Sequence, residues 1–358
     1  MNSIYRKISS RRVSPIHPPI LSLVVMFFLS LTAARGNRFD QPWRNLPTGS
    51  GAALTSIAAD SANSIMVGTT GDGVFRSVDG GPWRSANIGL KDSRIVRLAA
   101  SPAGYLLVAT ESGIFRSIDH GASWQFSIGN PAGKIFSIAF DSVGTAYAGG
   151  VGGVLLRSDD HGITWSAIDL TKTVPNIGGI FSLSVDSRNT IVASMYENGV
   201  PSISVLYSST DRGVTWNNIN NAQTKCFSVA VATDSHHHWF QILDSCNGFT
   251  GIYRNIDGAT WEPIGHIHPT AIFIDSHDHI ILAASGGMLI SQDGSATFEG
   301  AASDTIMRPI AIVQLADRTL AAADAGKIYR STDGGASWHT FSNASASILA
   351  DAGRPLHV

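Results

Sequence analysis

The sequence contains only two cysteines among its 358 residues, Cys226 and Cys246. So few thiols exclude a disulfide-rich scaffold, and their separation excludes a zinc cluster built on closely spaced cysteines. Charged residues are also scarce, at 15%, and the formal net charge is −2. Because no basic stripe is visible that could neutralise many phosphates, nucleic acid is not expected as a partner.

Helical periodicity is absent after residue 34, and the one long apolar run is Ile20–Leu31. It follows four basic residues and precedes the small residues Thr32-Ala33-Ala34, which predicts a signal peptide over residues 1–34 and a secreted or periplasmic protein. An uncleaved anchor and a twin-arginine signal are the alternatives, although the run is shorter than the roughly 20 residues of a membrane span. Without this segment the chain has 21 basic and 27 acidic residues, a net charge of −6.

A nine-residue pattern recurs along the chain. At Arg116–Trp124 it reads Arg-Ser-Ile-Asp-His-Gly-Ala-Ser-Trp, and it returns at intervals of 36 to 51 residues. With the aspartate as the register mark, the copies lie at Asp79, Asp119, Asp160, Asp211, Asp257, Asp293 and Asp333. A period near forty residues predicts a repeat architecture.

Each copy has the composition of a tight hairpin. The serine and aspartate side chains can accept backbone N–H groups, glycine takes a positive φ without strain, and tryptophan begins the next strand. The copy at Ser291–Phe298 departs from this pattern, because Ser295 occupies the glycine position and Phe298 the tryptophan position.

Four short strands are expected in each repeat. In the second repeat they are Ile95–Ala100, Tyr105–Thr110, Ile114–Ser117 and Trp124–Ile128. Seven such repeats predict an all-β fold, a seven-bladed β-propeller of four-stranded antiparallel blades, over residues 54–345. Residues 35–53 are expected to form a linker, in which Trp43–Leu46 could close the last blade or join a partial eighth one. The tail at 346–358 resembles the start of a further repeat, or a truncated one.

The repeated pattern resembles the Asp-box, Ser-x-Asp-x-Gly-x-Thr-Trp, of BNR-like propellers, and more distantly that of sialidase-like propellers. Gly113-Ile114-Phe115-Arg116-Ser117 through Trp124 is most similar to the repeats of the photosystem II assembly and stability factor-like family. This resemblance covers about residues 40–345. It implies a non-catalytic scaffold without a cofactor that docks on a protein client through a basic patch, a membrane protein being one candidate. We expect the protein to be a monomer.

Charge divides unevenly between the two faces of the expected ring. The Asp-box turns share one face with the turns between first and second strands, which carry Asp60, Asp141, Asp186, Asp234, Asp275 and Asp317. Loops of the opposite face carry the basic residues that we select as candidate binding residues: Arg94, Lys134, Lys172, Lys225 and Arg308. Extra residues at 169–179, 197–204 and 247–250 also fall on this second face, where repeat proteins tend to bind partners.

One position of the inner strand faces the expected axis. Small residues occupy it in six repeats, where the alignment places Ser56, Ser137, Ser182, Ser228, Ala271 and Ala311, and small side chains let the blades converge. The second repeat has Arg97 there instead. Because a charge near the axis requires a partner, water or a ligand, Arg97 is the leading candidate for a binding residue.

The cysteines and histidines allow two further interpretations. Cys226 and Cys246 lie on the first and second strands of the fifth repeat, so a cross-strand disulfide is predicted, with two buried free thiols as the alternative. Histidines cluster at His236–His238 and again at His266, His268, His277 and His279. Since consecutive side chains of a hairpin point to different sides, we expect no metal site.

Catalytic residues are not recognisable. A sialidase requires an arginine triad, a Tyr–Glu nucleophile pair and an acidic proton donor, and other glycosidases require two facing carboxylates. The acidic residues of this chain lie mostly in turns, where they have structural explanations. An enzyme is therefore not expected, and the alternative is a carbohydrate-active protein, either a sialidase-like glycosidase or a lectin-like glycan binder.

Overall fold

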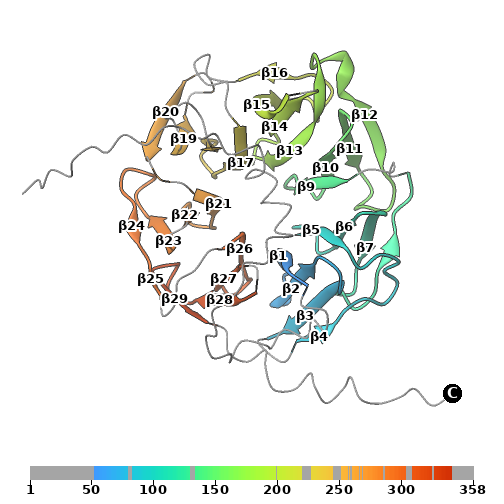
Figure 1. Cartoon of the computed structure of the whole chain (residues 1–358), viewed down its shortest axis with the longest axis vertical. Coiled ribbons are helices and arrows are strands. Elements are labelled where there is room, and N and C mark those ends of the chain that lie inside the picture. Colours follow the sequence, from blue (N-terminus) through green and yellow to red (C-terminus); the bar gives the residue numbers. More distant parts are fainter. Residues whose placement is uncertain are drawn as a thin grey trace, which may run out of the picture.

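The computed structural model describes residues 52–79, 83–129, 134–198, 200–219, 227–244, 251–256, 258, 260–265, 267, 269–284, 287–303, 309–324 and 326–340. These residues form seven antiparallel blades arranged in a ring around a central axis (Figure 1). The predicted all-β, seven-bladed propeller is therefore confirmed. The helical structure in the described ranges is the short 3-10 turn η2 (Leu170–Lys172), and none of it is a long apolar helix that could cross a membrane.

In the first six blades the strands follow one another outwards from the axis in chain order. The first blade consists of β1 (Leu54–Ala59), β2 (Ser64–Thr69), β3 (Val74–Val78) and β4 (Arg84–Ser85). The second consists of β5 (Ile95–Ala100), β6 (Leu106–Thr110), β7 (Gly113–Ser117) and β8 (Gln125–Phe126). The third consists of β9 (Ile135–Phe140), β10 (Ala146–Gly150), β11 (Val154–Ser158) and β12 (Ser166–Asp169). The fourth blade consists of β13 (Ile177–Val185), β14 (Ile191–Glu197), β15 (Val200–Ser209) and β16 (Asn217–Asn218). The fifth consists of β17 (Phe227–Thr233), β18 (Trp239–Asp244), β19 (Gly251–Asn255) and β20 (Trp261–Gly265). The sixth consists of β21 (Pro269–Ile274), β22 (Ile280–Ala284), β23 (Gly287–Ser291) and β24 (Glu299–Gly300).

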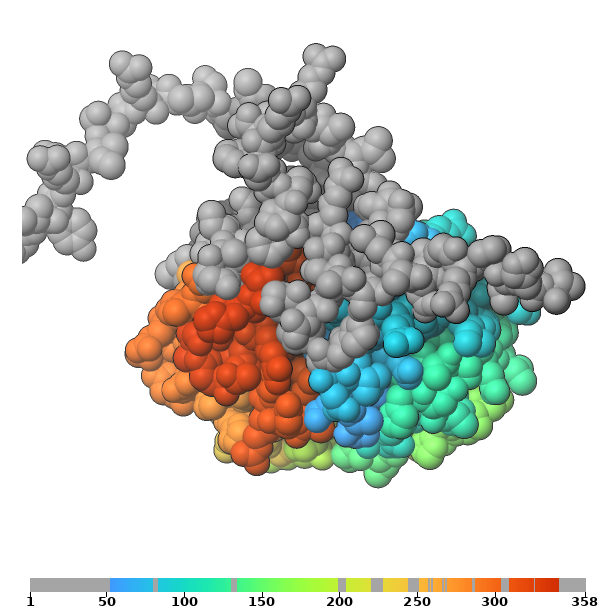
Figure 2. All heavy atoms as spheres, turned by 90° about the horizontal axis from the view of Figure 1, so that it is seen from below, coloured from blue at the N-terminus to red at the C-terminus, as the bar shows by residue number. Residues whose placement is uncertain are grey.

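The seventh blade is built from β26 (Ala311–Gln314), β27 (Leu320–Ala323), β28 (Ile328–Ser331) and β29 (Ser337–Thr340), with β25 (Ala302–Ser303) added in parallel at its outer edge. Its four antiparallel strands come from one continuous stretch, and the blade packs beside the first blade in the edge-on view (Figure 2). An N-terminal strand is thus not needed to complete it. Trp43–Leu46, the predicted signal peptide and the C-terminal tail lie outside the described residues.

The hydrophobic core is divided into seven clusters, one between each pair of neighbouring blades. Strand β6 shows how the sequence produces them: Leu106 and Val108 face the first blade, whereas Leu107 and Ala109 face the third. Side chains alternate along a strand, so a strand buried on both faces is apolar throughout. The cluster between blades seven and one closes the ring.

The Asp-box turns use the same hydrogen bonds in successive blades. Ser117 Oγ donates to Asp119 Oδ1 at 2.7 Å and accepts from the N–H of Gly121 at 2.9 Å, while Asp119 Oδ1 accepts from the N–H of Ser123 at 2.9 Å. Equivalent bonds fix the turns at Asp160, Asp211, Asp293 and Asp333. Asp79 directly follows β3, and Asp257 lies outside the described residues.

These bonds also change the acidity of the aspartates. Burial by itself raises the pKa of Asp119, but the hydrogen bonds from Ser123 and Ser117 outweigh it, so the net pKa is lowered. For Asp293, the hydroxyl and the N–H of Thr297 lower the pKa to about 2. The Asp-box carboxylates therefore act as ionised acceptors that organise the turn.

Ser295 is a strained member of the series. Its φ is +79°, its side chain is buried, and its Oγ has no hydrogen-bond partner among the described residues. We expect Ser295→Gly to raise the free energy of unfolding by about 1–2 kcal/mol, because it removes both the left-handed penalty and a buried unpaired hydroxyl. Denaturant unfolding would measure this, with Gly335→Ser in the seventh blade as the reverse change. A less stable Ser295→Gly variant would contradict the explanation.

Candidate functional site

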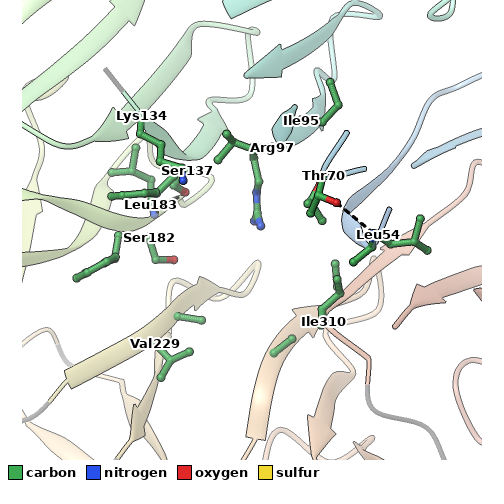
Figure 3. A pocket seen from close by; sticks show the side chains of 18 of the residues that line it. Leu54, Thr70, Ile95, Arg97, Lys134, Ser137, Ser182, Leu183, Val229 and Ile310 are labelled. Atoms are coloured by element: carbon green, nitrogen blue, oxygen red, sulfur yellow. Dashed lines mark hydrogen bonds between the residues drawn. The ribbon is translucent and has the colours of Figure 1, made fainter. Parts of the chain in front are cut away.

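A cavity of about 350 Å³ lies on the propeller axis, and residues of all seven inner strands line it (Figure 3). Most of its wall is apolar, for example Ile95, Val229 and Ile310. This volume lies near the lower end of the roughly 300–1,000 Å³ that is typical of ligand pockets. The cavity can therefore hold a side chain or the end of an extended segment.

A β-bulge precedes the axial residue in six of the seven inner strands. In six inner strands the register against the second strand shifts by one residue, and the residues that follow the shift are Ser56, Arg97, Ser137, Ser182, Ala230 and Ala271. The sequence alignment was wrong for the fifth blade, where it placed Ser228 at this position. Ser228 pairs with Leu243 before the bulge, at the position that Ile95 has in the second blade.

The serines at the axial position connect neighbouring blades. Ser56 Oγ accepts from the N–H of Leu98 at 3.0 Å, and the corresponding bonds run from Leu183 N–H to Ser137 at 3.0 Å and from Val231 N–H to Ser182 at 3.2 Å. Since a guanidinium has no acceptor atom, Arg97 cannot make this bond. The second blade thus replaces a structural acceptor with a cation.

The side chain of Arg97 extends into the cavity (Figure 3). No hydrogen bond or ion pair joins it to another described residue. Burial lowers the pKa of Arg97 from its ordinary value, yet an arginine stays charged at neutral pH. Because an enclosed cation without a partner is unfavourable, the cavity is suited to an acidic or carbonyl-bearing group.

Two other predicted residues lie at the rim of the same cavity. Arg94 contacts Glu111 at 2.7 Å and Asp92 at 3.1 Å, and Lys134 lies 3.5 Å from Glu111. The hydrogen bond that Arg94 donates to the Asp92 carboxylate raises the pKa of Arg94. Glu111 supplies the single carboxylate among the described residues that line the cavity, and both rim cations partly neutralise it.

Of the remaining predicted binding residues, the structure describes Lys172, which does not line this cavity. Lys172 ends η2 and is exposed, away from the lining residues. Lys225 and Arg308 lie outside the described residues, and so do Cys226 and Cys246. The structure therefore assembles Arg94, Arg97 and Lys134 from the predicted set.

Sequence reasoning missed an aromatic row beside Arg97. The rings of Phe136 and Phe181 stack with centroids 5.6 Å apart, and Phe181 contacts Tyr196 at 4.5 Å. Both phenylalanines are half-buried bulge residues, each placed directly before an axial serine, and both line the cavity. The residue preceding the axial position is thus the sequence signal that identifies them.

On the opposite face, the aspartates between first and second strands have the structural role that the sequence suggested. Asp60 Oδ1 accepts from the N–H groups of Ala62 and Ser64, both at 2.9 Å, and its side chain is buried. Asp141, Asp186, Asp234 and Asp275 make the same pair of bonds in their turns. These carboxylates stabilise turns, as Asx motifs do, and contribute little exposed charge.

Sequence comparisons identify one repeat and one curated relative. Residues 156–167 match the sequence model of the BNR/Asp-box repeat, which here contains the turn at Asp160. A xyloglucanase of Acetivibrio thermocellus is 28% identical over 174 residues, which is 45% of this chain and 19% of that protein. The chain spans about a fifth of the length of that relative.

Solved structures with the same fold have low sequence identity. YCF48 from Cyanidioschyzon merolae matches with a TM-score of 0.57 at 17% identity, over 80% of this chain and 97% of its own. YCF48 bound to D1 peptide matches with a TM-score of 0.60 at 19% identity, over 84% and 98%. The extracellular domain of a hybrid two-component system from B. thetaiotaomicron gives 0.63 at 16% identity, over 81% and 40%. Such identities show the fold alone, and the chain is therefore a seven-bladed β-propeller of Asp-box repeats.

Proposed function

We propose that the protein is an exported, non-catalytic scaffold that binds a protein client at the cavity rim. We call this surface the channel face and define it by Arg94, Arg97, Lys134, Phe136 and Phe181. The observation that carries the proposal is the Arg97 guanidinium, which extends unpaired into a largely apolar cavity. A client segment with an acidic side chain would supply the missing partner, and the phenylalanine rings would pack against its apolar neighbours.

The comparisons support protein binding without excluding a second function. YCF48 bound to D1 peptide is a propeller of this fold in complex with a peptide. The xyloglucanase belongs to the other class, and the stacked rings of Phe136 and Phe181 are the feature that would suit a glycan instead. Hydrolysis is disfavoured because a glycosidase requires two facing carboxylates. Among the described residues that line the cavity, Glu111 supplies the single carboxylate.

The setting of the proposed scaffold is the periplasm or the cell exterior. The predicted signal peptide over residues 1–34 carries this part of the proposal, and the similarity to an extracellular domain is consistent with it. In that oxidising environment the proposed Cys226–Cys246 disulfide would form. We further propose that the scaffold acts as a monomer.

Affinity capture from an envelope extract tests the function class. We expect the protein to retain protein clients that are released at high salt, because surface charge pairs are screened by salt. A glycan array and a fluorogenic glycosidase panel on the same preparation should give no specific binding and no turnover. Hydrolysis, specific sugar binding, or capture that is insensitive both to salt and to Arg97→Glu would contradict the proposal.

A further inference from the structure

Two neighbouring turns on the Asp-box face share the motif Asp-Ser-His-x-His. It occurs at Asp234–His238, between β17 and β18, and at Asp275–His279, between β21 and β22. In each turn the aspartate accepts the N–H groups of both histidines, and the two imidazoles stack with centroids 5.9 Å apart in the first turn and 5.6 Å in the second. The sequence argument considered consecutive histidines, which point to different sides, and it did not consider residues two apart, whose side chains lie on the same side here.

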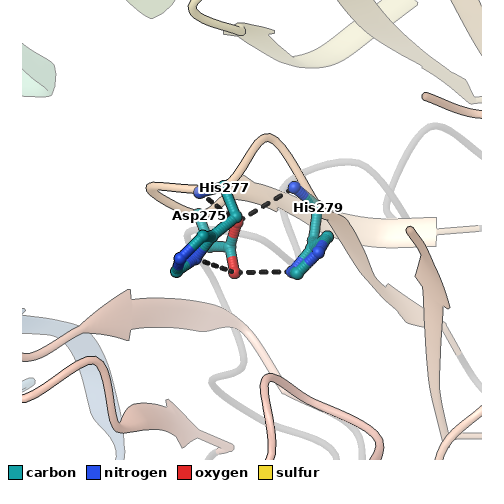
Figure 4. Close-up of side chains that lie close together, drawn as sticks. All are labelled: Asp275, His277 and His279. Carbon is teal, nitrogen blue, oxygen red and sulfur yellow. Dashed lines mark hydrogen bonds and ion pairs between the residues drawn. The ribbon is translucent and has the colours of Figure 1, made fainter. Parts of the chain in front are cut away.

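Three donor atoms converge in the second turn. Asp275 Oδ2 lies 2.9 Å from His279 Nδ1 and 3.9 Å from His277 Nδ1, and the donor atoms of the three residues all lie within 4.8 Å of one another (Figure 4). They line a second cavity of about 250 Å³, together with Asp317 and Arg318. The carboxylate is almost fully buried at the base, whereas the His277 side chain is 45% exposed.

We propose that Asp275, His277 and His279 bind a divalent cation of the zinc class, with water completing the coordination. Two imidazoles and one carboxylate are a donor set that zinc accepts with an open position. Bonds of about 2.0–2.1 Å place tetrahedral ligands roughly 3.3 Å apart, so His279 and Asp275 are already close enough. The exposed His277 side chain, whose Nδ1 lies 3.9 Å from Asp275 Oδ2, has to approach the carboxylate by roughly 0.6 Å and His279 by at most about 1.5 Å to complete the site.

The turn itself orients the carboxylate. Asp275 Oδ1 accepts from His277 N–H at 2.8 Å and from His279 N–H at 2.9 Å, which directs Oδ2 towards the two imidazoles. Such support from hydrogen bonds beyond the ligand atoms is typical of metal sites. One charged group opposes a cation: Arg318 Nη1 lies 3.3 Å from His277 Nε2. The carboxylate of Asp317 faces the same cavity and lies 3.8 Å from Arg330.

The first turn provides a matched comparison, because its donors are divided. His238 Nδ1 lies 2.7 Å from Asp234 Oδ2, but His236 Nδ1 lies 3.2 Å from Asp278, which belongs to the other turn. Among the residues that the structure describes, the group of three at Asp275 is the one in which such donors converge. The two turns therefore share the sequence motif but differ in how their histidine and aspartate donor atoms are arranged.

Calorimetric titration of the full chain, without a histidine tag, with zinc chloride at neutral pH tests the site. We expect one zinc ion per chain, and at least about tenfold weaker binding in the variants His277→Ala, His279→Ala and Asp275→Asn. Asparagine retains an oxygen that can accept the turn's N–H groups, so Asp275→Asn separates loss of charge from loss of the turn. Circular dichroism and denaturant unfolding of each variant confirm that it is folded.

Two further variants make the outcome specific. The double variant His236→Ala, His238→Ala should bind zinc as the unmodified protein does, and Arg318→Gln should bind it several-fold more tightly because a competing cation is gone. Absence of zinc binding by the unmodified protein would overturn the proposal. The proposal would also be overturned if the His236→Ala, His238→Ala variant lost as much zinc affinity as the His277→Ala and His279→Ala variants. The ion would then not be held specifically at Asp275.

Discussion

Replacement of Arg97 by serine is expected to weaken client binding strongly while leaving the propeller at least as stable as the unmodified protein. Serine is the residue that three other blades use at this position, where its Oγ accepts an N–H from the next blade. In the second blade the corresponding donor is the N–H of Ile138. The new hydrogen bond and the loss of an enclosed cation should together add about 0.5–1.5 kcal/mol to the free energy of unfolding.

Although Arg97→Ser should stabilise the fold, we expect it to weaken the binding of the client. Removing a charge that is paired in a complex and shielded from water costs about 2–4 kcal/mol, which corresponds to a roughly 30- to 1,000-fold weaker affinity. Arg94→Ser is the control, because Arg94 lies exposed at the rim and is already paired with Glu111. We expect its affinity to change by less than about fivefold. Unchanged binding in Arg97→Ser, or a loss of stability, would show that Arg97 has a structural role instead.

Trp338→Ala is expected to lower the free energy of unfolding by about 3–5 kcal/mol, the largest stability effect among the changes considered. The indole is fully buried between the sixth and seventh blades, and its Nε1–H donates to the carbonyl of Gly335 at 2.9 Å. Alanine would leave a cavity at the blade whose packing on β1 closes the ring. Denaturant unfolding measures the loss.

Two variants calibrate that measurement. Trp338→Phe should lose about 1–2 kcal/mol, because the sixth blade has Phe298 at the same position of its Asp-box and retains its turn. Thr332→Ala, at an exposed position of the same turn, should stay within about 0.5 kcal/mol. Similar small losses for Trp338→Ala and Thr332→Ala would mean that blade packing does not depend on the tryptophan.

The fold could be predicted because the same pattern of strands and Asp-box turns recurs along the sequence. The first predicted strand of the second repeat, Ile95–Ala100, coincides with β5. The fourth was predicted over Trp124–Ile128, whereas β8 covers only Gln125–Phe126. Beyond it, Ile128 leaves the blade and pairs with Thr164 in the next one. Strand propensity within a repeat does not encode that exchange, since it depends on packing between blades.

A residue of the candidate site could be predicted only where it differs from the residues at the same position of the other repeats. Arg97 was identifiable because the corresponding residues are small, but the pairing of Arg94 with Glu111 and the stacking of Phe136 on Phe181 join residues from different segments. Ser228 was misplaced because the extra residue of a β-bulge decides which residue faces the axis, and the repeat sequence does not mark where that extra residue lies. The histidine arrangement was missed for a related reason: the Asp275 hydrogen bonds determine where the imidazoles point.

Site-specific photo-crosslinking in an envelope extract tests the central claim most directly. A benzoylphenylalanine at position 181 would report on the channel face, and the same residue at position 118, where Ile118 is exposed in an Asp-box turn, would report on the opposite face. We expect a protein adduct from position 181 that disappears in the Arg97→Ser background, and none from position 118. Adducts that form equally from both positions, or that persist without Arg97, would contradict binding at the channel face.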